Sequence, residues 1–226
     1  MSEITCNVAG RSTLAVSVDT LVMAGWAGRD AAKVESHILE LAELGVKRPK
    51  STPCFYRVAP SLLTAGQTID VLGSNSSGEV EVALLSSSTH GLLIGVGSDH
   101  TDREVEAYDI SVSKQMCDKP IRADWWLYDD LASQWDQLVM RSWRWVGPRR
   151  ELYQEGTTAQ LLDPLVLVRK LCTQDDLPGG TVVFCGTQPV IGRLVFGDAF
   201  EIELHDPVLK RSRSHRYGVR TLPGAE

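Results

Sequence analysis

Apolar and polar residues alternate with a period of two over many short stretches of the chain, which is typical of β-strands with one buried face. The expected strands are 67–72, 79–85, 91–97, 138–146, 180–185, 193–195 and 199–204, one within 53–63 that ends at Pro60, and a hairpin over 12–24 that turns at Asp19-Thr20. Helical spacing is less common. The pattern therefore favours an α+β fold built on a folded sheet or roll.

The clearest helical pattern follows the segment GWAGRDAAK. Val34, Ile38, Leu41 and Leu44 recur at intervals of three or four residues, and Gly45 provides a stop signal. We expect an amphipathic helix here. Further helical patterns cover 129–140 and 157–171, the second despite Pro164, whereas 105–118 fits either a helix or extended structure.

The chain has 226 residues, of which 43% are hydrophobic and 23% are charged, and its formal net charge is −6. These values fit one globular domain over residues 1–226, large enough to bury a core and enclose a pocket. The acidic balance argues against nucleic acid or an anionic membrane as the main partner. No apolar run is long enough to span a bilayer.

Five cysteines, at positions 6, 54, 117, 172 and 185, are odd in number, widely spaced and without a CxxC pair. We interpret them as reduced thiols of a cytoplasmic protein. The N-terminal MSEITCNVAG has no cationic start followed by an apolar stretch, so no signal peptide is expected. The tryptophan-rich stretch 121–146 is expected in the core or in a subunit interface.

Three carboxylates are the strongest candidates for chemistry. Glu79 and Glu81 lie two apart in an expected strand, so both side chains face the same side. Two close carboxylates repel each other unless a positive charge lies between them. Asp99, at the end of the next strand, would complete an oxygen-rich cluster suited to Mg²⁺ or Mn²⁺. The alternative is that strand carboxylates two apart simply face solvent.

A histidine and a glutamate share one face of the expected helix. Glu40 could orient the imidazole of His37 as a base toward water, which would support hydrolysis. The alternative is an exposed histidine on a charged face. His100 follows Asp99 directly and would point the other way in an extended segment, so we interpret it as structural.

Five blocks, in one order, resemble motifs of the fumarylacetoacetate hydrolase family over roughly residues 25–204. The blocks are EVEV (79–82), SDHTDRE (98–104), SVSKQM (111–116), LYQEGTTAQLLDPLVLVRKL (152–171) and LPGGTVVFCGTQPVIGRLVFGDAFEIEL (177–204). They are similar to the family's E-x-E metal strand, its N-D-x-[ST]-x-R-[DE] block, its block with a substrate-facing lysine, its N-G-x-x-x-Q-x-x-[ST] segment and its G-T-P-x-G-V-G region. Each motif alone is weak, and their shared order makes the match specific.

The resemblance implies a mixed β-sandwich roll of the family's C-terminal-domain type, with a catalytic core over about 25–204. It implies that Glu79, Glu81 and Asp99 bind Mg²⁺ or Mn²⁺ and that Lys114 faces the substrate, a small carboxylate. It also implies a homodimer.

Other candidate substrate contacts follow from the same alignment. Lys114 would offer a point charge and Arg57 a two-pronged contact to a carboxylate, although a structural salt bridge explains Arg57 equally well. Thr187, in the turn after Gly186, offers a hydroxyl or a backbone donor. Gln115 is a further candidate pocket contact.

Several departures place the chain in a divergent, bacterial-type subgroup. The family's G-x-N-Y-x-x-H-x-x-E start has no clean counterpart. His37 and Glu40 keep the H-x-x-E spacing, but an alignment from ELGV (43–46) puts Glu40 and Glu43 there and leaves no histidine. Arg57 replaces the usual lysine of the F-L-K-P strand, and GTPxGVG has become GTQPVIG.

The leading hypothesis is a Mg²⁺- or Mn²⁺-dependent hydrolase that cleaves a carbon–carbon bond in a small 2-oxo or 2,4-dioxo carboxylic acid. In this hypothesis His37 and Glu40 activate water, and Lys114 and Arg57 neutralise the negative charge of the substrate. The rival is a decarboxylase, hydratase, dehydratase or tautomerase that acts on a 2-oxo acid through a metal-bound enolate. A third possibility is a protein that binds metal and oxo acid without turnover. Fold alone does not choose among them.

Overall fold

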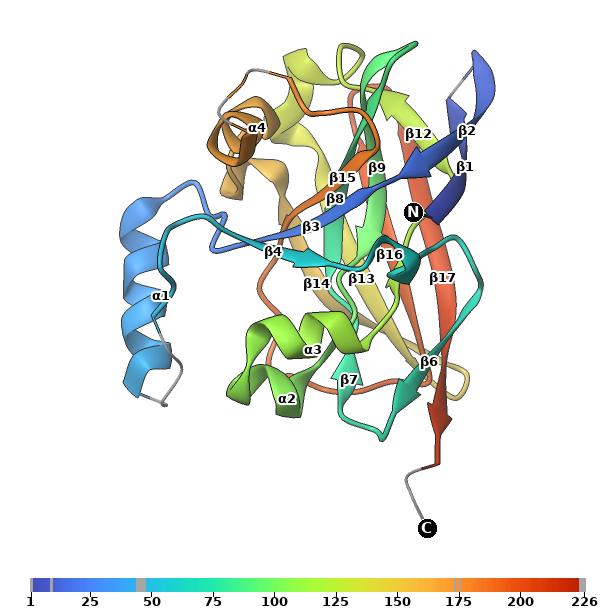
Figure 1. The fold of residues 1–226 in the computed structure, drawn as a ribbon. Coiled ribbons are helices and arrows are strands. Elements are labelled where there is room, and N and C mark those ends of the chain that lie inside the picture. The colour runs from blue at the N-terminus through green and yellow to red at the C-terminus, as the bar shows by residue number, and fades with distance from the viewer. Residues whose placement is uncertain (1, 9, 44–47, 173, 175, 224–226) are drawn as a thin grey trace.

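Two mixed β-sheets, of eight and five strands, form most of the molecule. The computed structural model describes residues 2–8, 10–43, 48–172, 174 and 176–223. Figure 1 shows the sheets crossing the centre of the molecule with the helices at its margins. This architecture confirms the predicted α+β class.

The eight-stranded sheet has the order β2-β1-β12-β9-β8-β15-β3-β4. In chain order its strands are β1 (Ser2–Val8), β2 (Ser12–Val18), β3 (Thr20–Gly25), β4 (Cys54–Val58), β8 (Val80–Ser87), β9 (Gly91–Ser98), β12 (Asp124–Leu127) and β15 (Thr181–Thr187). β1 pairs with β12 and β3 with β15 in parallel, and the other neighbours are antiparallel.

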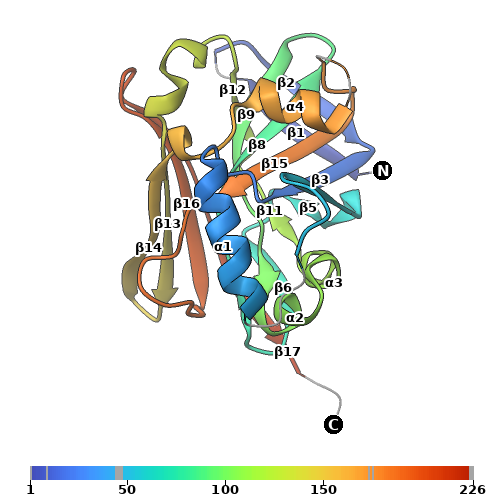
Figure 2. The same ribbon diagram turned by 90° about the vertical axis from the view of Figure 1, so that its left-hand side faces the viewer.

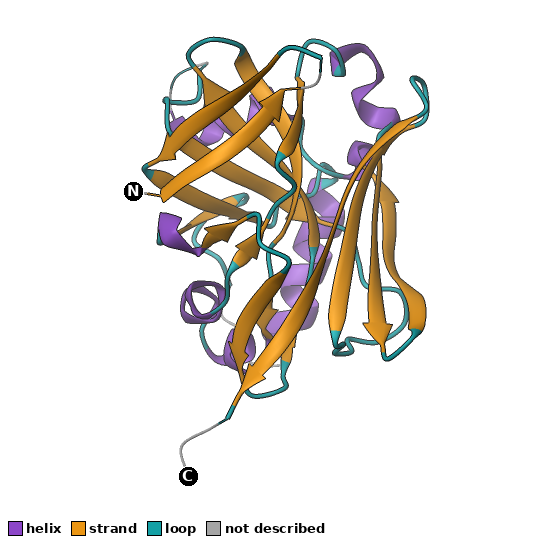
Figure 3. Cartoon of the chain, turned by 90° about the vertical axis from the view of Figure 1, so that its right-hand side faces the viewer, coloured by secondary structure: helices purple, strands orange, loops and turns teal. Residues whose placement is uncertain are grey.

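The five-stranded sheet has the order β14-β13-β16-β17-β6. Its strands are β6 (Thr68–Leu72), β13 (Val139–Val146), β14 (Arg149–Thr157), β16 (Ala199–Asp206) and β17 (Arg211–Leu222). Two short pairs lie outside both sheets, β5 (Leu63–Thr64) with β11 (Lys119–Pro120) and β7 (Ser76–Ser77) with β10 (Thr101–Asp102). Figure 2 shows β13, β14 and β16 as one layer and β8, β9 and β15 as another, and Figure 3 shows the same two layers of strands from the other side.

The α-helices are short apart from the first. They are α1 (Ala31–Glu43), α2 (Arg103–Tyr108), α3 (Ile110–Met116) and α4 (Pro164–Cys172), and the 3₁₀ turns are η1 (Pro60–Leu62), η2 (Ala132–Gln137) and η3 (Thr158–Gln160). Pro164 occupies the first turn of α4, where its missing N–H costs nothing, so the predicted helix begins there instead of at residue 157. No helix among the described residues is long and apolar enough to cross a membrane.

The main hydrophobic core lies between the two sheets. Val82 and Leu84 of β8 belong to it together with Ile202 of β16, whereas Ala83 and Leu85 belong to a second core on the opposite face of the large sheet. Strand alternation therefore buries both faces of β8. Trp125, Trp126 and Trp135 are buried as predicted, whereas Trp143 and Trp145 are half-buried.

Most local predictions are confirmed and two strand predictions are wrong. The segment 12–24 does form two strands, but they are not a hairpin, because β2 pairs with β1 and β3 pairs with β15 and β4. Residues 193–195 form no strand and lie in a largely exposed loop between Gly192, whose φ is +80°, and Gly197. The predicted helix is α1, and the expected Leu44 and Gly45 positions lie outside the described residues.

Candidate metal centre

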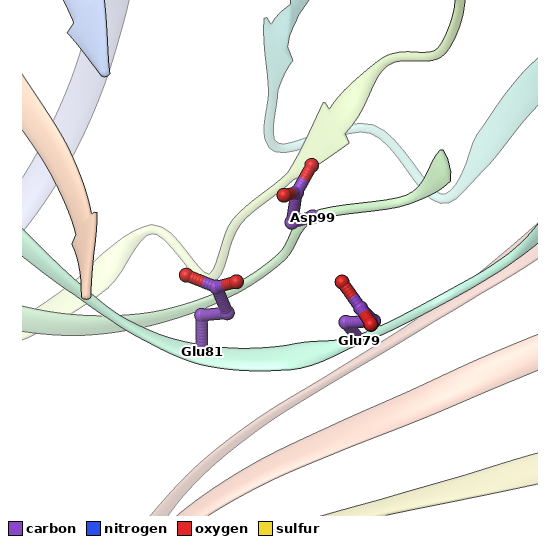
Figure 4. Close-up of side chains that lie close together, drawn as sticks. All are labelled: Glu79, Glu81 and Asp99. Carbon is purple, nitrogen blue, oxygen red and sulfur yellow. The ribbon is translucent and has the colours of Figure 1, made fainter. Parts of the chain in front are cut away.

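Three carboxylates come together at the open end of the β8–β9 hairpin, opposite its turn. Glu79 precedes β8, Glu81 lies within it, and Asp99 follows β9. The two strands pair Glu81 with Gly97, and the Asp99 amide donates a hydrogen bond to the Glu79 carbonyl at 3.0 Å. Figure 4 shows the three carboxyl groups pointing into a common space. The cluster follows from strand alternation and the hairpin register.

One oxygen from each of Glu79, Glu81 and Asp99 lies within 4.8 Å of the others. Asp99 is fully buried, Glu81 is 3% exposed, and the Glu79 side chain is 15% exposed. Three charges this close and this far from water require nearby cations or a bound metal ion. We call these three residues the acid cluster.

Two lysines contact the two carboxylate oxygens of Asp99. Lys114 of α3 forms a short ion pair with Oδ2, and Lys119 of β11 lies 3.0 Å from Oδ1. Lys119 also donates to the His100 carbonyl at 2.6 Å. Both lysines are buried, so each needs a nearby negative charge, and Asp99 supplies one to both.

A buried arginine neutralises the other end of the cluster. Arg103 Nη2 lies 3.2 Å from Glu79, and Arg103 Nη1 lies 2.7 Å from Glu106. The Glu106 carboxylate also lies 4.0 Å from the Lys114 ammonium. Arg103 therefore braces the loop and contacts a candidate metal ligand as well.

Two aspartates explain why the ambiguous segment 105–118 becomes two short helices. The Asp102 side chain accepts a hydrogen bond from the Val105 amide and caps α2. The Asp109 side chain accepts from two amides at the start of α3. These N-caps place Arg103 in the first turn of α2 and Lys114 in the last turn of α3, both next to the acid cluster.

Burial and charge shift the pKa values of the acids in opposite directions. Burial and the Asp99 charge raise the pKa of Glu81 well above its ordinary value. Burial also raises the pKa of Glu79, against the opposing effect of Arg103. Burial would raise the pKa of Asp99 too, but Lys114 and Lys119 outweigh it and hold that pKa below its ordinary value. Glu79 and Glu81 therefore favour their protonated forms in the metal-free site, and a bound cation would favour their ionised forms.

The turn after β15 contacts Glu81. The Gly186 amide, in a residue with a φ of +97°, donates to Glu81 Oε2 at 2.7 Å. Thr187 lies opposite Glu81, but its hydroxyl donates to the Val80 carbonyl at 2.9 Å and accepts from Gln154 at 2.8 Å. The Thr187 hydroxyl predicted to contact substrate is thus engaged within the protein, and it is Gly186 that contacts the cluster.

His100 has a structural role, as the sequence predicted. Its ring is buried, and it shares hydrogen bonds with Tyr217 at 3.0 Å and Ser76 at 2.9 Å. Tyr217 also shares a hydrogen bond with Ser98 at 2.7 Å. These contacts tie the end of β9, and with it Asp99, to β17 of the other sheet.

The structure does not bring His37 and Glu40 into the acid cluster. They contact each other at 3.6 Å on α1, with side chains 61% and 69% exposed. The His37 ring lies 5.6 Å from the ring of Trp26, whose side chain lies beside that of Tyr56. The Tyr56 ring centroid lies 5.9 Å from Lys114 Nζ. Among the described residues, only the side chains of Trp26 and Tyr56 connect His37 to the acid cluster.

Arg57 and Gln115 also lie away from the acid cluster. Arg57 is exposed and lies opposite Val22 in the neighbouring strand, and Val22 faces the core between the sheets. Glu81 lies on the other face of the eight-stranded sheet, together with Ala83 of the second core. Alternation therefore directs Arg57 to the opposite face. Gln115 is exposed and accepts a hydrogen bond from the Ala59 amide at 2.9 Å, so it fastens α3 to the loop after β4.

Lys119 is the site residue that sequence reasoning missed. It lies in the segment CDKP, where a lysine between an aspartate and a proline is typical of a surface turn. Its burial depends on the parallel pairing of β11 with β5, which no local pattern reveals.

The residues of the cluster fit a divalent cation. All three offer oxygen only, and no histidine or cysteine joins them within the described residues, which favours Mg²⁺ or Mn²⁺ over zinc. Glu81 accepts only the Gly186 amide among its described hydrogen bonds, so one of its oxygens can face an ion. A cation bound here would also offset the burial that raises the pKa values of Glu79 and Glu81.

A family model described as "Protein of unknown function (DUF2848)" matches residues 24–217. No curated protein matches the chain in sequence. The structure is similar to 2-keto-3-deoxy-D-arabinonate dehydratase complexed with magnesium and 2,5-dioxopentanoate, with a TM-score of 0.65 and 15% identity, over 94% of this chain and 77% of the dehydratase.

Two further solved structures are similar. Yeast ynq8, a fumarylacetoacetate hydrolase family protein, gives a TM-score of 0.61 and 18% identity, over 92% of this chain and 95% of that one. Cg1458 gives a TM-score of 0.65 and 14% identity, over 95% of this chain and 83% of that one. At these identities the likeness shows a shared fold, that of fumarylacetoacetate hydrolase family proteins.

Proposed function

The chain belongs to the DUF2848 family, whose function is unknown, and from its own site we propose a divalent-metal-dependent enzyme that acts on a small 2-oxo carboxylic acid. The observation that carries the proposal is the acid cluster, in which three carboxylates lie within 4.8 Å of one another beside the buried Lys114. A structurally similar dehydratase complexed with magnesium and 2,5-dioxopentanoate supports the choice of metal and substrate class.

Each residue of the site has a role in this proposal. Glu79, Glu81 and Asp99 would hold Mg²⁺ or Mn²⁺, which when bound supplies Lewis acidity toward the substrate's carbonyl oxygen. Lys114 binds the substrate's negative charge, because Asp99 and the glutamates, against the effect of burial, raise its pKa and keep it cationic. Arg103 holds Glu79 in place.

We favour chemistry that passes through an enolate next to the carbonyl, formed by proton removal in a dehydratase or tautomerase and by loss of CO₂ in a decarboxylase. Hydrolysis needs a group that activates water, and the candidate dyad of His37 and Glu40 is mostly exposed on α1. Enolate-type chemistry needs stabilisation of a developing negative charge, which Lys114 and a divalent cation held by the acid cluster would supply.

Carbon–carbon bond hydrolysis is the second candidate, and one observation favours it. The His37 ring lies 5.6 Å from the Trp26 ring, and Trp26 lies beside Tyr56, whose ring is next to Lys114, so aromatic side chains join the helix that carries the dyad to the site. In that case His37 and Glu40 would activate water after α1 moves toward the cluster.

A homodimeric, cytoplasmic enzyme remains part of the proposal. Half-buried Trp143 and Trp145 lie in β13 of the five-stranded sheet, where Arg150 and Arg216 stack on them with centroid distances of 3.7 and 3.8 Å. Aromatic and arginine side chains of this kind are enriched in subunit interfaces. Light scattering on the purified chain tests the dimer.

The experiment that tests the function begins with metal removal by a chelator and restoration of Mg²⁺ or Mn²⁺. Ultraviolet absorbance then follows acylpyruvates, oxaloacetate and sugar-derived 2-oxo acids. Metal-dependent turnover that Glu81→Gln abolishes supports the proposal, and His37→Ala separates its two forms because only hydrolysis should need the imidazole. Binding of metal and oxo acid with no product from any substrate would instead indicate a binding protein without turnover.

A further inference from the structure

Lys119 is a buried cation that the proposed chemistry does not yet use. It has no exposed surface, and its ammonium contacts Asp99 Oδ1 at 3.0 Å and the His100 carbonyl at 2.6 Å. A fully buried lysine is costly unless it is paired. β11 holds its backbone against β5, and Pro120 follows directly, so the side chain extends from a fixed position.

The two lysines on Asp99 differ in their other contacts. Lys114 has a second carboxylate, Glu106, at 4.0 Å, and its charge also interacts with Glu79 and Glu81. Lys119 forms an ion pair with Asp99 alone among the described residues. When a metal ion enters the cluster, Lys114 can therefore turn to Glu106 or to a substrate anion, whereas Lys119 keeps its place beside Asp99.

The formal charges of the buried group can be counted. With every carboxylate ionised, as the binding of a metal ion requires, the four carboxylates are Glu79, Glu81, Asp99 and Glu106 and the three cations are Arg103, Lys114 and Lys119, which leaves one net negative charge before the ion is added. A divalent ion changes this to one net positive charge. Without Lys119 the loaded site would be neutral. In a buried site such a difference acts strongly on any charged ligand.

We propose that Lys119 sets the charge of this site, so that the site binds a metal ion weakly by itself and binds a carboxylate anion tightly once the metal ion is present. This inference rests on the proposed function and adds a selection rule to it. The loaded site is completed by a singly charged 2-oxo acid, which brings the formal net charge to zero, whereas a neutral carbonyl compound leaves it positive. Lys119 acts through Asp99 and through its field, and not by contact with the substrate.

The test measures two affinities by titration calorimetry, first of Mn²⁺ alone and then of oxalate on the Mn²⁺-saturated protein. Oxalate carries two negative charges, so its affinity responds to the charge of the site more strongly than that of a singly charged 2-oxo acid. Lys119→Met keeps the length and apolar stem of the side chain and removes its charge. We expect this variant to bind Mn²⁺ about ten-fold more tightly or better, and to bind oxalate about ten-fold more weakly or worse. Lys119→Arg keeps the charge and should return both affinities toward those of the wild type.

A second variant keeps the test decisive if Lys119→Met does not fold. Glu106→Gln, at a partly exposed position, makes the site one unit more positive, so it should weaken Mn²⁺ binding and strengthen oxalate binding. Lys33→Met is the matched control, because the Lys33 side chain is 86% exposed and should leave both affinities unchanged.

Opposite shifts of the two affinities are the signature of a charge effect. A Lys119→Met protein that binds both ligands more weakly would show that Lys119 only supports the structure, and one that binds both as the wild type does would show no role. Either result overturns the inference while the metal site stands. A folded wild-type protein that binds no Mn²⁺ overturns the proposed function itself.

Discussion

Asp99→Asn is the substitution whose effect on stability follows most directly from the structure. It removes one charge with almost no change in shape, at a residue that is fully buried. Lys119 then loses its ion pair, and Lys114 keeps only Glu106 at 4.0 Å. Removing one partner of a buried ion pair leaves an uncompensated charge, which costs about 3–5 kcal/mol of unfolding free energy.

The assay is urea unfolding of the metal-free protein, followed by fluorescence of the buried Trp125 and Trp126. In a chain of this size each kcal/mol lowers the melting temperature by about 2–4 °C, so thermal unfolding should shift by about 6–20 °C. The matched control is Asp70→Asn. Asp70 pairs with Arg220 at 2.6 Å, but both side chains are exposed, so this variant should unfold close to the wild type.

Glu81→Gln also replaces a carboxylate of the acid cluster by an amide, but it should not lower the free energy of unfolding as Asp99→Asn does. Burial and Asp99 raise the pKa of Glu81, so its charge is unfavourable in the metal-free protein. Gln keeps an acceptor for the Gly186 amide. We expect no loss of stability, or a gain. If Asp99→Asn and Asp70→Asn lower stability equally, the reasoning about buried charge is wrong.

Three further predictions concern metal, substrate and pH. Mn²⁺ at about 100 times its dissociation constant should add about 2.7 kcal/mol to the unfolding free energy of the wild type, and nothing to Glu81→Gln. Arg57→Gln should leave kcat/KM for any accepted 2-oxo acid nearly unchanged, whereas Lys114→Met should lower it by about ten-fold or more; equal losses would place Arg57 in the site. Burial lowers the pKa of His215, so the unfolded chain takes up a proton that the folded one does not, and stability falls as the pH drops below about 6.5. Urea unfolding between pH 7 and 5 should show a smaller loss for His215→Gln, and parallel curves would contradict this assignment.

The acid cluster could be predicted from the sequence because it depends on local geometry. Glu79 and Glu81 share a face by strand alternation, and Asp99 follows the next strand of the same hairpin. The Gly91–Ser98 strand pairs with its immediate neighbour in sequence, so the register carries little ambiguity. Only the family resemblance, and not the pattern, distinguished this cluster from two solvent-facing carboxylates.

Features that depend on distant pairing could not be predicted. The two strands within 12–24 look like a hairpin because a turn joins them, yet β3 finds its parallel partner in β15, some 160 residues later. Lys119 is buried for a similar reason, since β11 pairs with β5. Local alternation places residues on a face but does not say which strand lies beside it.

The position of Arg57 was within reach of the sequence. Tyr56 and Arg57 are neighbours in a strand, so only one of them can face the cluster, and the ring centroid of Tyr56 lies 5.9 Å from Lys114 Nζ. His37 is different, because its distance from the site depends on how α1 packs, which the helical pattern leaves open.

Anomalous scattering from a crystal soaked in Mn²⁺ shows whether the acid cluster binds a metal ion. We expect one anomalous peak, from an ion bound to an oxygen of each of Glu79, Glu81 and Asp99, with Lys119 still beside Asp99. Well-defined carboxylates with no peak between them, and Lys114 still paired with Asp99, would contradict it.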